Sequence, residues 1–270
     1  MRNNLYDYHI HSSFSSDCEP ENVMAAVVDI AVERGIAGIA ITDHFEPLWP
    51  DENYLNVLEI PAYETALTET EQLCAGRIRF AKGIELGLIP GEALDICQQT
   101  VSAYPYDFVI SAVHYSPAVP IHALVFHENR SLEEVLEEYY TILLDSIKEY
   151  KNYDIIGHIN AIDRYTYSLA PQELYMPFID EILRIVISDG KGIEINTSAF
   201  RYGIGDRGTP TQPILDRFKE LGGEIVTIGS DAHRLADVGA FIEKGEEMLL
   251  AAGFRYAAAF SGRRPEFIKL

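Results

Sequence analysis

The sequence is poor in cysteine, in basic residues and in long apolar runs, and each shortage excludes a class of protein. Its three cysteines form no Cys-x-x-Cys pair, so we expect no disulfide framework and a reducing cytoplasm as the location. No apolar run approaches the ~20 residues that a membrane span needs. With 21 Lys and Arg against 42 Asp and Glu, the formal charge of −21 argues against nucleic acid or anionic membranes as partners.

What the sequence does contain is a regular alternation of strand and helix patterns over its 270 residues. Short apolar runs, typical of strands covered on both faces, alternate with segments whose apolar residues follow helical spacing. We expect strands at about residues 5–11, 36–41, 78–84, 108–113, 153–157, 192–196 and 224–229. We expect helices at about residues 20–34, 53–75, 91 onward, 131–147, 171–189, 211–221 and 236–250.

This alternation predicts an α/β fold with parallel strands joined by right-handed crossovers. Seven strand–helix units without a Pro- or Gly-rich linker indicate one domain over residues 1–270. Their number suggests a barrel of the triosephosphate-isomerase type, one unit short, with a doubly wound open sheet as the alternative. The oligomeric state is left open.

Six of the eight histidines fall at, or just beyond, the C-terminal ends of predicted strands. In a parallel barrel these ends converge on one face, where active sites are built. Two acidic residues occupy equivalent strand ends, and a third lies in the first loop after a strand. The sequence therefore predicts a metal site with nine candidate ligands: His9, His11, Asp17, His44, Glu85, His114, His158, Asp231 and His233.

The first strand presents two of these ligands together. Residues two apart in a strand share a face, so His9 and His11 can bind one ion from the same side. On the same rule we expect Tyr8 and Ile10 to point to the other side.

Nine ligands exceed what one ion can use, so the sequence favours several ions. Imidazole and carboxylate ligands without thiolate suit zinc, manganese or ferrous iron. Glu85 is the best placed carboxylate to bridge two ions. Three divalent ions would carry six positive charges against three from Asp17, Glu85 and Asp231. The pocket would then be locally cationic and would suit a phosphate ester.

A set of short motifs resembles the PHP (polymerase and histidinol phosphatase) superfamily from residue 7 to about residue 240. The resemblance implies a distorted (β/α)7 barrel with its active site at the C-terminal strand ends and a trinuclear metal centre. The motifs are His9-x-His11, Thr42-Asp43-His44, Gly83-Ile84-Glu85, Ser111-Ala112-Val113-His114-Tyr115, Gly157-His158 and Ser230-Asp231-Ala232-His233.

The resemblance also implies how the ligands divide among three ions. Many histidinol phosphatases of this family carry a histidine where Asp17 stands, which makes Asp17 the least secure assignment. The implied sets are His9, His11, Glu85 and Asp231 for one ion, Glu85, His114 and His158 for the second, and Asp17, His44 and His233 for the third.

Two further motifs resemble the histidinol-phosphatase branch of the superfamily. They are Ile162-Asp163-Arg164-Tyr165 and the segment from Glu194 to Arg201. Each places an arginine just beyond a strand end, where a guanidinium fork can hold phosphate oxygens. The alternative for each arginine is a surface salt bridge to one of the many carboxylates.

The function that the resemblance implies is a metal-dependent phosphomonoesterase, a histidinol-phosphatase of histidine biosynthesis. It would convert L-histidinol phosphate to L-histidinol and phosphate with a metal-activated hydroxide as the nucleophile. Arg164 and Arg201 would bind the phosphate, and Asp231 and His233 are candidate proton donors to the leaving group.

Three alternatives remain open at this point. The first is a PHP phosphoesterase that acts on another small phosphate ester or a nucleotide. The second is a metal-binding scaffold without catalysis. The third is a metal-dependent amide hydrolase, which the paired arginines and the absence of a lysine at a predicted strand end disfavour.

Several residues near the candidate site are expected to serve other purposes. Asp43 should support the site or cap a segment rather than bind metal. His122 and His127 lie in a predicted loop over residues 115–130, which we expect to act as a lid or specificity element. Trp49 is expected to pack under a loop, and Cys18 to be a small buried residue.

Overall fold

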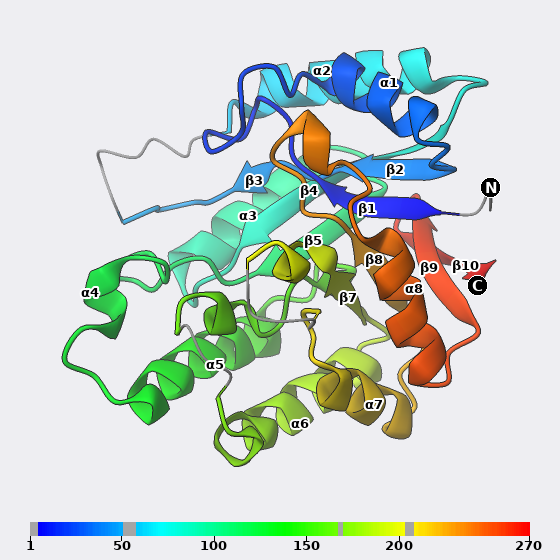
Figure 1. Cartoon of the computed structure of the whole chain (residues 1–270). Coiled ribbons are helices and arrows are strands. Elements are labelled where there is room, and N and C mark those ends of the chain that lie inside the picture. Colours follow the sequence, from blue (N-terminus) through cyan, green and yellow to red (C-terminus); the bar gives the residue numbers. More distant parts are fainter. Residues whose placement is uncertain (1–4, 51–57, 167–169, 203–207) are drawn as a thin grey trace.

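The computed structural model describes residues 5–50, 58–166, 170–202 and 208–270, and within these ranges eight strands form one parallel sheet (Figure 1). The order is β1-β2-β4-β5-β6-β7-β8, with the short β3 paired to the C-terminal part of β4. The strands are β1 (Tyr6–Ile10), β2 (Gly38–Ile41), β3 (His44–Phe45), β4 (Arg79–Gly87), β5 (Phe108–Ala112), β6 (Ile155–Ile156), β7 (Gly192–Asn196) and β8 (Val226–Gly229).

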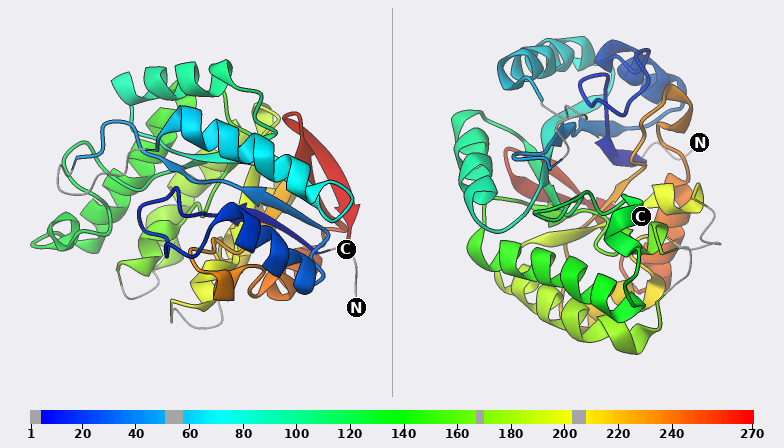
Figure 2. Two further views of the ribbon diagram at one scale, coloured as in Figure 1. Left: turned by 90° about the horizontal axis from the view of Figure 1, so that it is seen from above. Right: turned by 90° about the vertical axis from the view of Figure 1, so that its left-hand side faces the viewer.

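Helices cover the outside of this sheet, as both views of Figure 2 show. Ser131 begins the longest described helix with the predicted capping box, because its side chain and that of Glu134 bond each other's backbone N–H groups. The helices are α1 (Met24–Glu33), α2 (Ile60–Cys74), α3 (Glu92–Ala103), α4 (Leu124–His127), α5 (Leu132–Glu149), α6 (Gln172–Ser188), α7 (Gln212–Glu220) and α8 (Ile242–Ala251). None of the described helices is long and apolar enough to cross a membrane.

The sheet closes where its first strand meets the segment that follows its last. The Asp231 N–H donates to the His9 carbonyl at 2.7 Å, and the His11 N–H donates to the Ala232 carbonyl at 3.0 Å. The predicted distorted (β/α)7 barrel is therefore confirmed, and the open sheet is excluded.

The predicted elements differ from the observed ones mainly at their ends. The first helix begins at Met24 rather than near Pro20, which lies in a turn. The second begins at Ile60, and residues 53–57 of the predicted helix lie outside the described residues. A one-turn helix, α4, interrupts the segment expected to be a loop.

A C-terminal β-hairpin, β9 (Tyr256–Ser261) with β10 (Arg264–Lys269), was not predicted. It lies at the end of the barrel where β1 begins (Figure 1). Ala258, Ala259 and Phe260 are buried there in a cluster with side chains of β1, β2, β4, β5 and β6 and with none from the helices. The hairpin therefore closes the N-terminal end of the barrel.

The side chain of Tyr8 points into the barrel. The sequence predicted instead that it points to the side opposite His9 and His11. The register of β1 against β2 passes from Asp7↔Ile39 to Ile10↔Ile41, so three steps on one strand match two on the other. This β-bulge breaks the alternation of faces. Tyr8 packs inside the barrel against Phe108, with ring centroids 5.5 Å apart, and its hydroxyl donates to the Phe260 carbonyl at 3.2 Å. Ile10 joins the cluster that contains residues of α1, as expected.

Candidate metal centre

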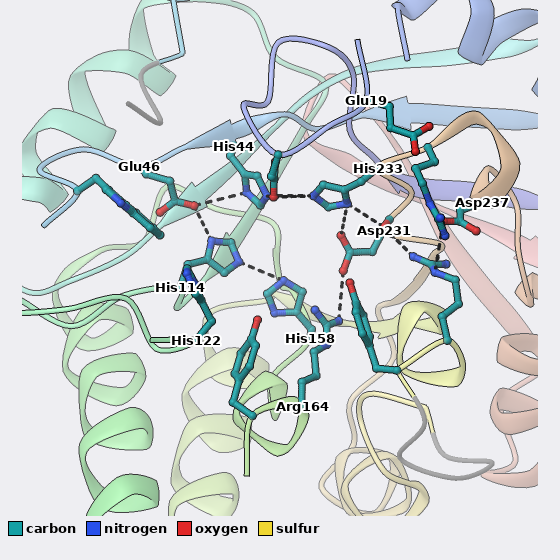
Figure 3. A pocket seen from close by; sticks show the side chains of 16 residues that line it. Glu19, His44, Glu46, His114, His122, His158, Arg164, Asp231, His233 and Asp237 are labelled. Atoms are coloured by element: carbon teal, nitrogen blue, oxygen red, sulfur yellow. Dashed lines mark hydrogen bonds and ion pairs between the residues drawn. The ribbon is translucent and has the colours of Figure 1, made fainter. Parts of the chain in front are cut away.

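The C-terminal strand ends bring all nine predicted ligands to one end of the barrel. Six of them line a cavity of about 550 Å³, part of which Figure 3 shows. The other three, His9, His11 and Glu85, are completely buried. The predicted convergence on one face is therefore observed, while metal binding by these residues stays a prediction.

The six histidines among the nine candidate ligands form three pairs, and in each pair the two Nε2 atoms face each other. Two of the pairs are drawn in Figure 3. Two neutral imidazoles can share only one hydrogen bond, so three facing pairs in a buried site are typical of rings that converge on a cation. The Nε2–Nε2 distances are 3.0 Å for His9 and His11, 3.3 Å for His114 and His158, and 3.4 Å for His44 and His233.

A carboxylate accompanies each histidine pair. Nitrogen and oxygen donors that lie within 4.8 Å of one another can surround a divalent cation. One such group, His9, His11 and Asp231, lies within a ligand set that the family resemblance implies, whereas another joins His9 to Glu85 and His158 across two of the sets. The contacts to Nε2 atoms include 3.3 Å from Asp231 Oδ1 to His11, 3.0 Å from Glu85 Oε1 to His158, and 3.1 Å from Asp17 Oδ2 to His233.

The Glu85 carboxylate faces two groups of histidines with different oxygens. Its Oε1 lies 3.0 Å from His158 Nε2, and its Oε2 lies 3.3 Å from His9 Nε2. Burial raises the pKa of Glu85, but His9, His114 and His44 outweigh burial and hold it well below its usual value. An ionised carboxylate with one oxygen toward each group has the geometry that a bridging ligand needs.

Asp17 lies where the third ligand set requires it. Its Oδ2 is 3.1 Å from His233 Nε2 and 3.6 Å from His44 Nε2. Its side chain is 39% exposed, so it is the most accessible of the nine at the rim of the cavity. Cys18 lies close to Asp17 and His233. Burial raises the pKa of its thiol, and this disfavours the thiolate form that would bind a metal.

Local backbone conformation fixes two of the candidate ligands. Asp231 has a φ of 53° and His158 a φ of 20°, in a region that residues other than glycine rarely adopt. Such conformations persist where the surrounding structure holds them, and they gather at functional sites. At the adjacent Gly229, a Cβ atom would lie 2.3 Å from the His9 Cβ, so only glycine leaves room for His9.

Asp43 supports the site through two serines, as predicted. It accepts hydrogen bonds from the backbone and hydroxyl groups of both Ser12 and Ser15, at 2.6–3.1 Å. The Ser15 hydroxyl also lies 3.2 Å from His11 Nδ1. Asp43 thereby fixes the first loop after β1 against a candidate ligand.

Two carboxylates beside the candidate ligands were missed in the sequence. Glu194 Oε1 lies 2.6 Å from His9 Nδ1, and its Oε2 accepts from the His158 N–H at 3.0 Å. Glu46 Oε1 lies 2.5 Å from His114 Nδ1. Glu194 could have been found from the sequence. Asn196 ends its strand, and Glu194, two residues earlier, shares the face of Asn196. Burial raises the pKa of Glu46, yet the net effect of His114 and His44 is to lower it.

The two predicted phosphate-binding arginines both line the cavity. Arg164 Nη2 donates to the side chains of Ser198 and Asn196 at 2.7 and 3.1 Å and to Asp231 Oδ2 at 3.2 Å. Its Nε has no hydrogen-bond partner among the described residues. Arg201 donates through Nη1 and Nη2 to the carbonyls of Ser230 and Asp231, both at 2.9 Å. Arg201 therefore holds the Asp231 segment in addition to its place at the cavity.

Aromatic rings line another part of the cavity wall. The rings of Trp49 and His122 are stacked with centroids 6.2 Å apart, and Tyr165 lies 6.3 Å from His122. Trp49 packs against Tyr115, with ring centroids 5.1 Å apart, and it also lines the cavity. His127 lies 2.7 Å from the Ile121 carbonyl through Nε2 and is not among the residues that line the cavity.

Comparisons with known proteins agree on one family. The PHP domain model matches residues 7–198. A histidinol-phosphatase of Lactococcus lactis is 30% identical over 264 residues, which cover 96% of this chain and 95% of that protein. A probable histidinol-phosphatase of Clostridium acetobutylicum is 28% identical. That alignment covers 87% of this chain and 89% of the relative.

Solved structures show the same relationship. The histidinol phosphate phosphatase of Lactococcus lactis, complexed with zinc, L-histidinol and phosphate, matches with a TM-score of 0.87 at 28% identity. The match covers 97% of this chain and 99% of that one. A structure from Listeria monocytogenes has a TM-score of 0.75 at 16% identity, over 88% of this chain and 99% of its own, and supports the fold alone.

Proposed function

The chain belongs to the PHP domain family, and from this premise we propose that it is a histidinol-phosphatase. It hydrolyses L-histidinol phosphate to L-histidinol and phosphate, with residues 1–270 acting as one metal-dependent phosphatase domain. The observation that carries this proposal is the set of three facing histidine pairs, each with a carboxylate, beside a cavity that two arginines line. Near-full-length similarity to a histidinol-phosphatase supports the choice of substrate.

Three divalent ions complete the site in this proposal. Zinc is the first choice because the Lactococcus lactis relative binds it, and manganese and ferrous iron are the alternatives. When bound, the ions supply Lewis acidity and activate a water molecule for attack on phosphorus. The proposed ligands are His9, His11, Glu85 and Asp231 for one ion, Glu85, His114 and His158 for the second, and Asp17, His44 and His233 for the third.

Arg164 binds the phosphate in this proposal. Its Nη2 is fully engaged with protein acceptors, while its buried Nε is left without a partner among the described residues. Arg164 lines the cavity, so its guanidinium would place a fixed positive charge beside a bound phosphate, where negative charge develops. Arg201 adds a second positive charge and keeps Asp231 in its conformation.

Asp231 and His233 are the proposed proton donors to the leaving alcohol, and their surroundings differ. Asp231 Oδ2 accepts from Arg164, Asn196 and Ser198 at 3.1–3.2 Å, which stabilises the ionised carboxylate. His233 reaches the cavity with 23% of its side chain exposed. A bound ion would take the Nε2 of His233, so only its Nδ1, which lies 3.1 Å from the Asp231 carbonyl, could carry the proton.

The aromatic wall of the cavity receives the organic half of the substrate. Trp49, His122 and Tyr165 present ring systems to the cavity, and the imidazole of histidinol is flat and aromatic. Stacking between such rings is favourable beyond simple burial. This wall would distinguish histidinol phosphate from phosphate esters without a ring.

A kinetic panel on the zinc-loaded protein tests the proposal. We expect kcat/KM for L-histidinol phosphate to exceed that for glycerol phosphate and for nucleoside monophosphates by on the order of 10²-fold or more. A protein that is inert on histidinol phosphate but active on nucleotides would be a PHP phosphoesterase with another substrate. A protein without turnover on the whole panel would be a metal-binding scaffold.

A further inference from the structure

Glu46 occupies a position that the short strand β3 creates. His44 pairs with Glu85 and Phe45 with Leu86. Glu46, the residue that follows β3, therefore comes beside Gly87. A Cβ atom at Gly87 would lie 1.6 Å from Glu46 Oε2. The Glu46 carboxylate therefore fills space that only a glycine leaves free, and the residue is 5% exposed.

The contacts of Glu46 are with the rear of two candidate ligand rings. Its Oε1 lies 2.5 Å from His114 Nδ1 and 3.4 Å from His44 Nδ1, and Figure 3 shows both contacts. In each ring the other nitrogen, Nε2, faces a second candidate ligand, His158 in the case of His114 and His233 in the case of His44. His44 Nδ1 is closer to Glu85 Oε2, at 2.8 Å, so the main partner of Glu46 is His114.

A carboxylate behind a histidine ligand does three things. It accepts the Nδ1–H and thereby fixes the tautomer, which leaves the Nε2 lone pair for the metal. It also holds the plane of the ring and raises the basicity of the ligand nitrogen. Glu194 of β7 has the same relation to His9 of β1, at 2.6 Å.

We propose that Glu46 is a positioning residue that orients His114, and to a smaller degree His44, for metal binding. Glu46 then connects two ion positions, because His114 belongs to the second ligand set and His44 to the third. This role rests on the proposed metal centre, but not on which phosphate ester is hydrolysed.

The test compares zinc retention by the holoprotein in Glu46→Gln, Gly87→Ala and wild type. Gly87→Ala changes no ligand but removes the space for the Glu46 carboxylate. The matched control is Glu71→Gln, which replaces an exposed glutamate paired with Lys82. Zinc is withdrawn with a graded series of chelators and measured by elemental analysis, while circular dichroism and thermal melting report the fold.

We expect Glu46→Gln to bind part of its zinc about 10–100-fold more weakly than wild type. Gly87→Ala should show the same loss of zinc affinity, and the double variant Glu46→Gln/Gly87→Ala should lose little more. The zinc affinity of Glu71→Gln should match that of wild type. A folded Glu46→Gln protein with wild-type zinc affinity would overturn the proposal. If Glu46→Gln does not fold, Glu46→Ala is measured in its place, and a folded Glu46→Ala protein with wild-type zinc affinity would overturn the proposal.

A double-mutant cycle separates positioning from direct ligation. If Glu46 acts through His114, the Glu46→Gln change should add little loss of zinc to a His114→Ala protein. A full additional loss in that background would show that Glu46 acts independently of His114 and would overturn its assignment as a positioning residue. Because zinc retention is the readout, the proposal is decided even if the loaded wild-type enzyme proves inert on histidinol phosphate.

Discussion

The two ends of the barrel interior are opposite in character. At the C-terminal ends of the strands, histidines and carboxylates converge beside an open cavity. At the N-terminal ends, Phe108 and alanines of the strands fill the interior together with Phe260 of the β9–β10 hairpin. The change occurs between Tyr8 and His9, which are adjacent in sequence and lie within the bulge of β1. One barrel thus combines an apolar end that stabilises the fold with a polar end that is available for chemistry.

The polar end is more acidic than the sequence alone suggests. Glu46 and Glu194 add two negative charges to those of Asp17, Glu85 and Asp231. Three divalent ions would bring six positive charges against these five, and Glu19 and Asp237 also line the cavity, so the ions alone do not make the pocket cationic. The sequence analysis counted only three carboxylates. With the additional ones, the positive charge of Arg164 matters more for phosphate binding.

The largest expected effect comes from Glu85→Gln at the polar end. Loss of the bridging charge should lower kcat/KM on the order of 10³-fold, since a metal centre contributes several kcal/mol to transition-state stabilisation. Steady-state kinetics and zinc analysis measure the effect, with thermal melting as the control for folding. Near wild-type activity with full zinc content would contradict a bridging role.

Phe260→Ala makes the corresponding change at the apolar end. It should reduce the free energy of unfolding by about 3–5 kcal/mol, because it removes a buried aromatic ring and leaves a cavity. The kcat per folded molecule should stay unchanged. Urea denaturation and active-site titration check both expectations, and a large fall in kcat of the folded protein would show that the two ends are not independent.

Arg164→Ala should lower kcat/KM for histidinol phosphate about 10²-fold while zinc content is retained. The physical reason is the loss of the guanidinium charge from the cavity. Inhibition by inorganic phosphate should weaken in parallel, which steady-state inhibition kinetics can measure. Unaltered phosphate inhibition would argue that Arg164 serves only to hold Asp231.

Trp49→Ala should raise KM for histidinol phosphate about tenfold and leave kcat/KM for glycerol phosphate unchanged, because only the first substrate has a ring to stack. The comparison of the two substrates is its own control. An equal loss on both would place Trp49 outside the substrate-binding wall.

The smallest expected effect is proton release when zinc binds the metal-free protein. Burial lowers the pKa of His114, but Glu46 and Glu85 outweigh it and raise the pKa to about 9. At pH 7 the metal-free ring is therefore protonated, and zinc must displace the proton. Affinity should rise with pH up to about 9, at most about tenfold per pH unit for each proton displaced. Calorimetry in buffers of different ionisation enthalpy measures the protons released, and a value of zero would contradict this charge state.

The polar end was more predictable from the sequence than the apolar end, for physical reasons. His44, His114 and His158 each follow an apolar run, and the ends of parallel strands must meet on one face. Glu46 could not be found in this way, because its position depends on the extra strand β3 and on the missing side chain of Gly87.

The hairpin and the inward position of Tyr8 escaped prediction for different reasons. The segment Tyr256–Ser261 is rich in alanine, which has a low strand propensity, and its pairing with β10 depends on the barrel interior. Tyr8 faces inward because of a bulge, and a regular period of two cannot reveal a bulge.

The central claim is that the polar end is a metal centre that hydrolyses histidinol phosphate. The most direct test strips the metals with a chelator, verifies their absence by elemental analysis, and titrates zinc back during turnover of histidinol phosphate. We predict no turnover by the metal-free protein and a return of activity with bound zinc, complete at three ions per chain. Full turnover by protein that contains no metal would contradict the claim.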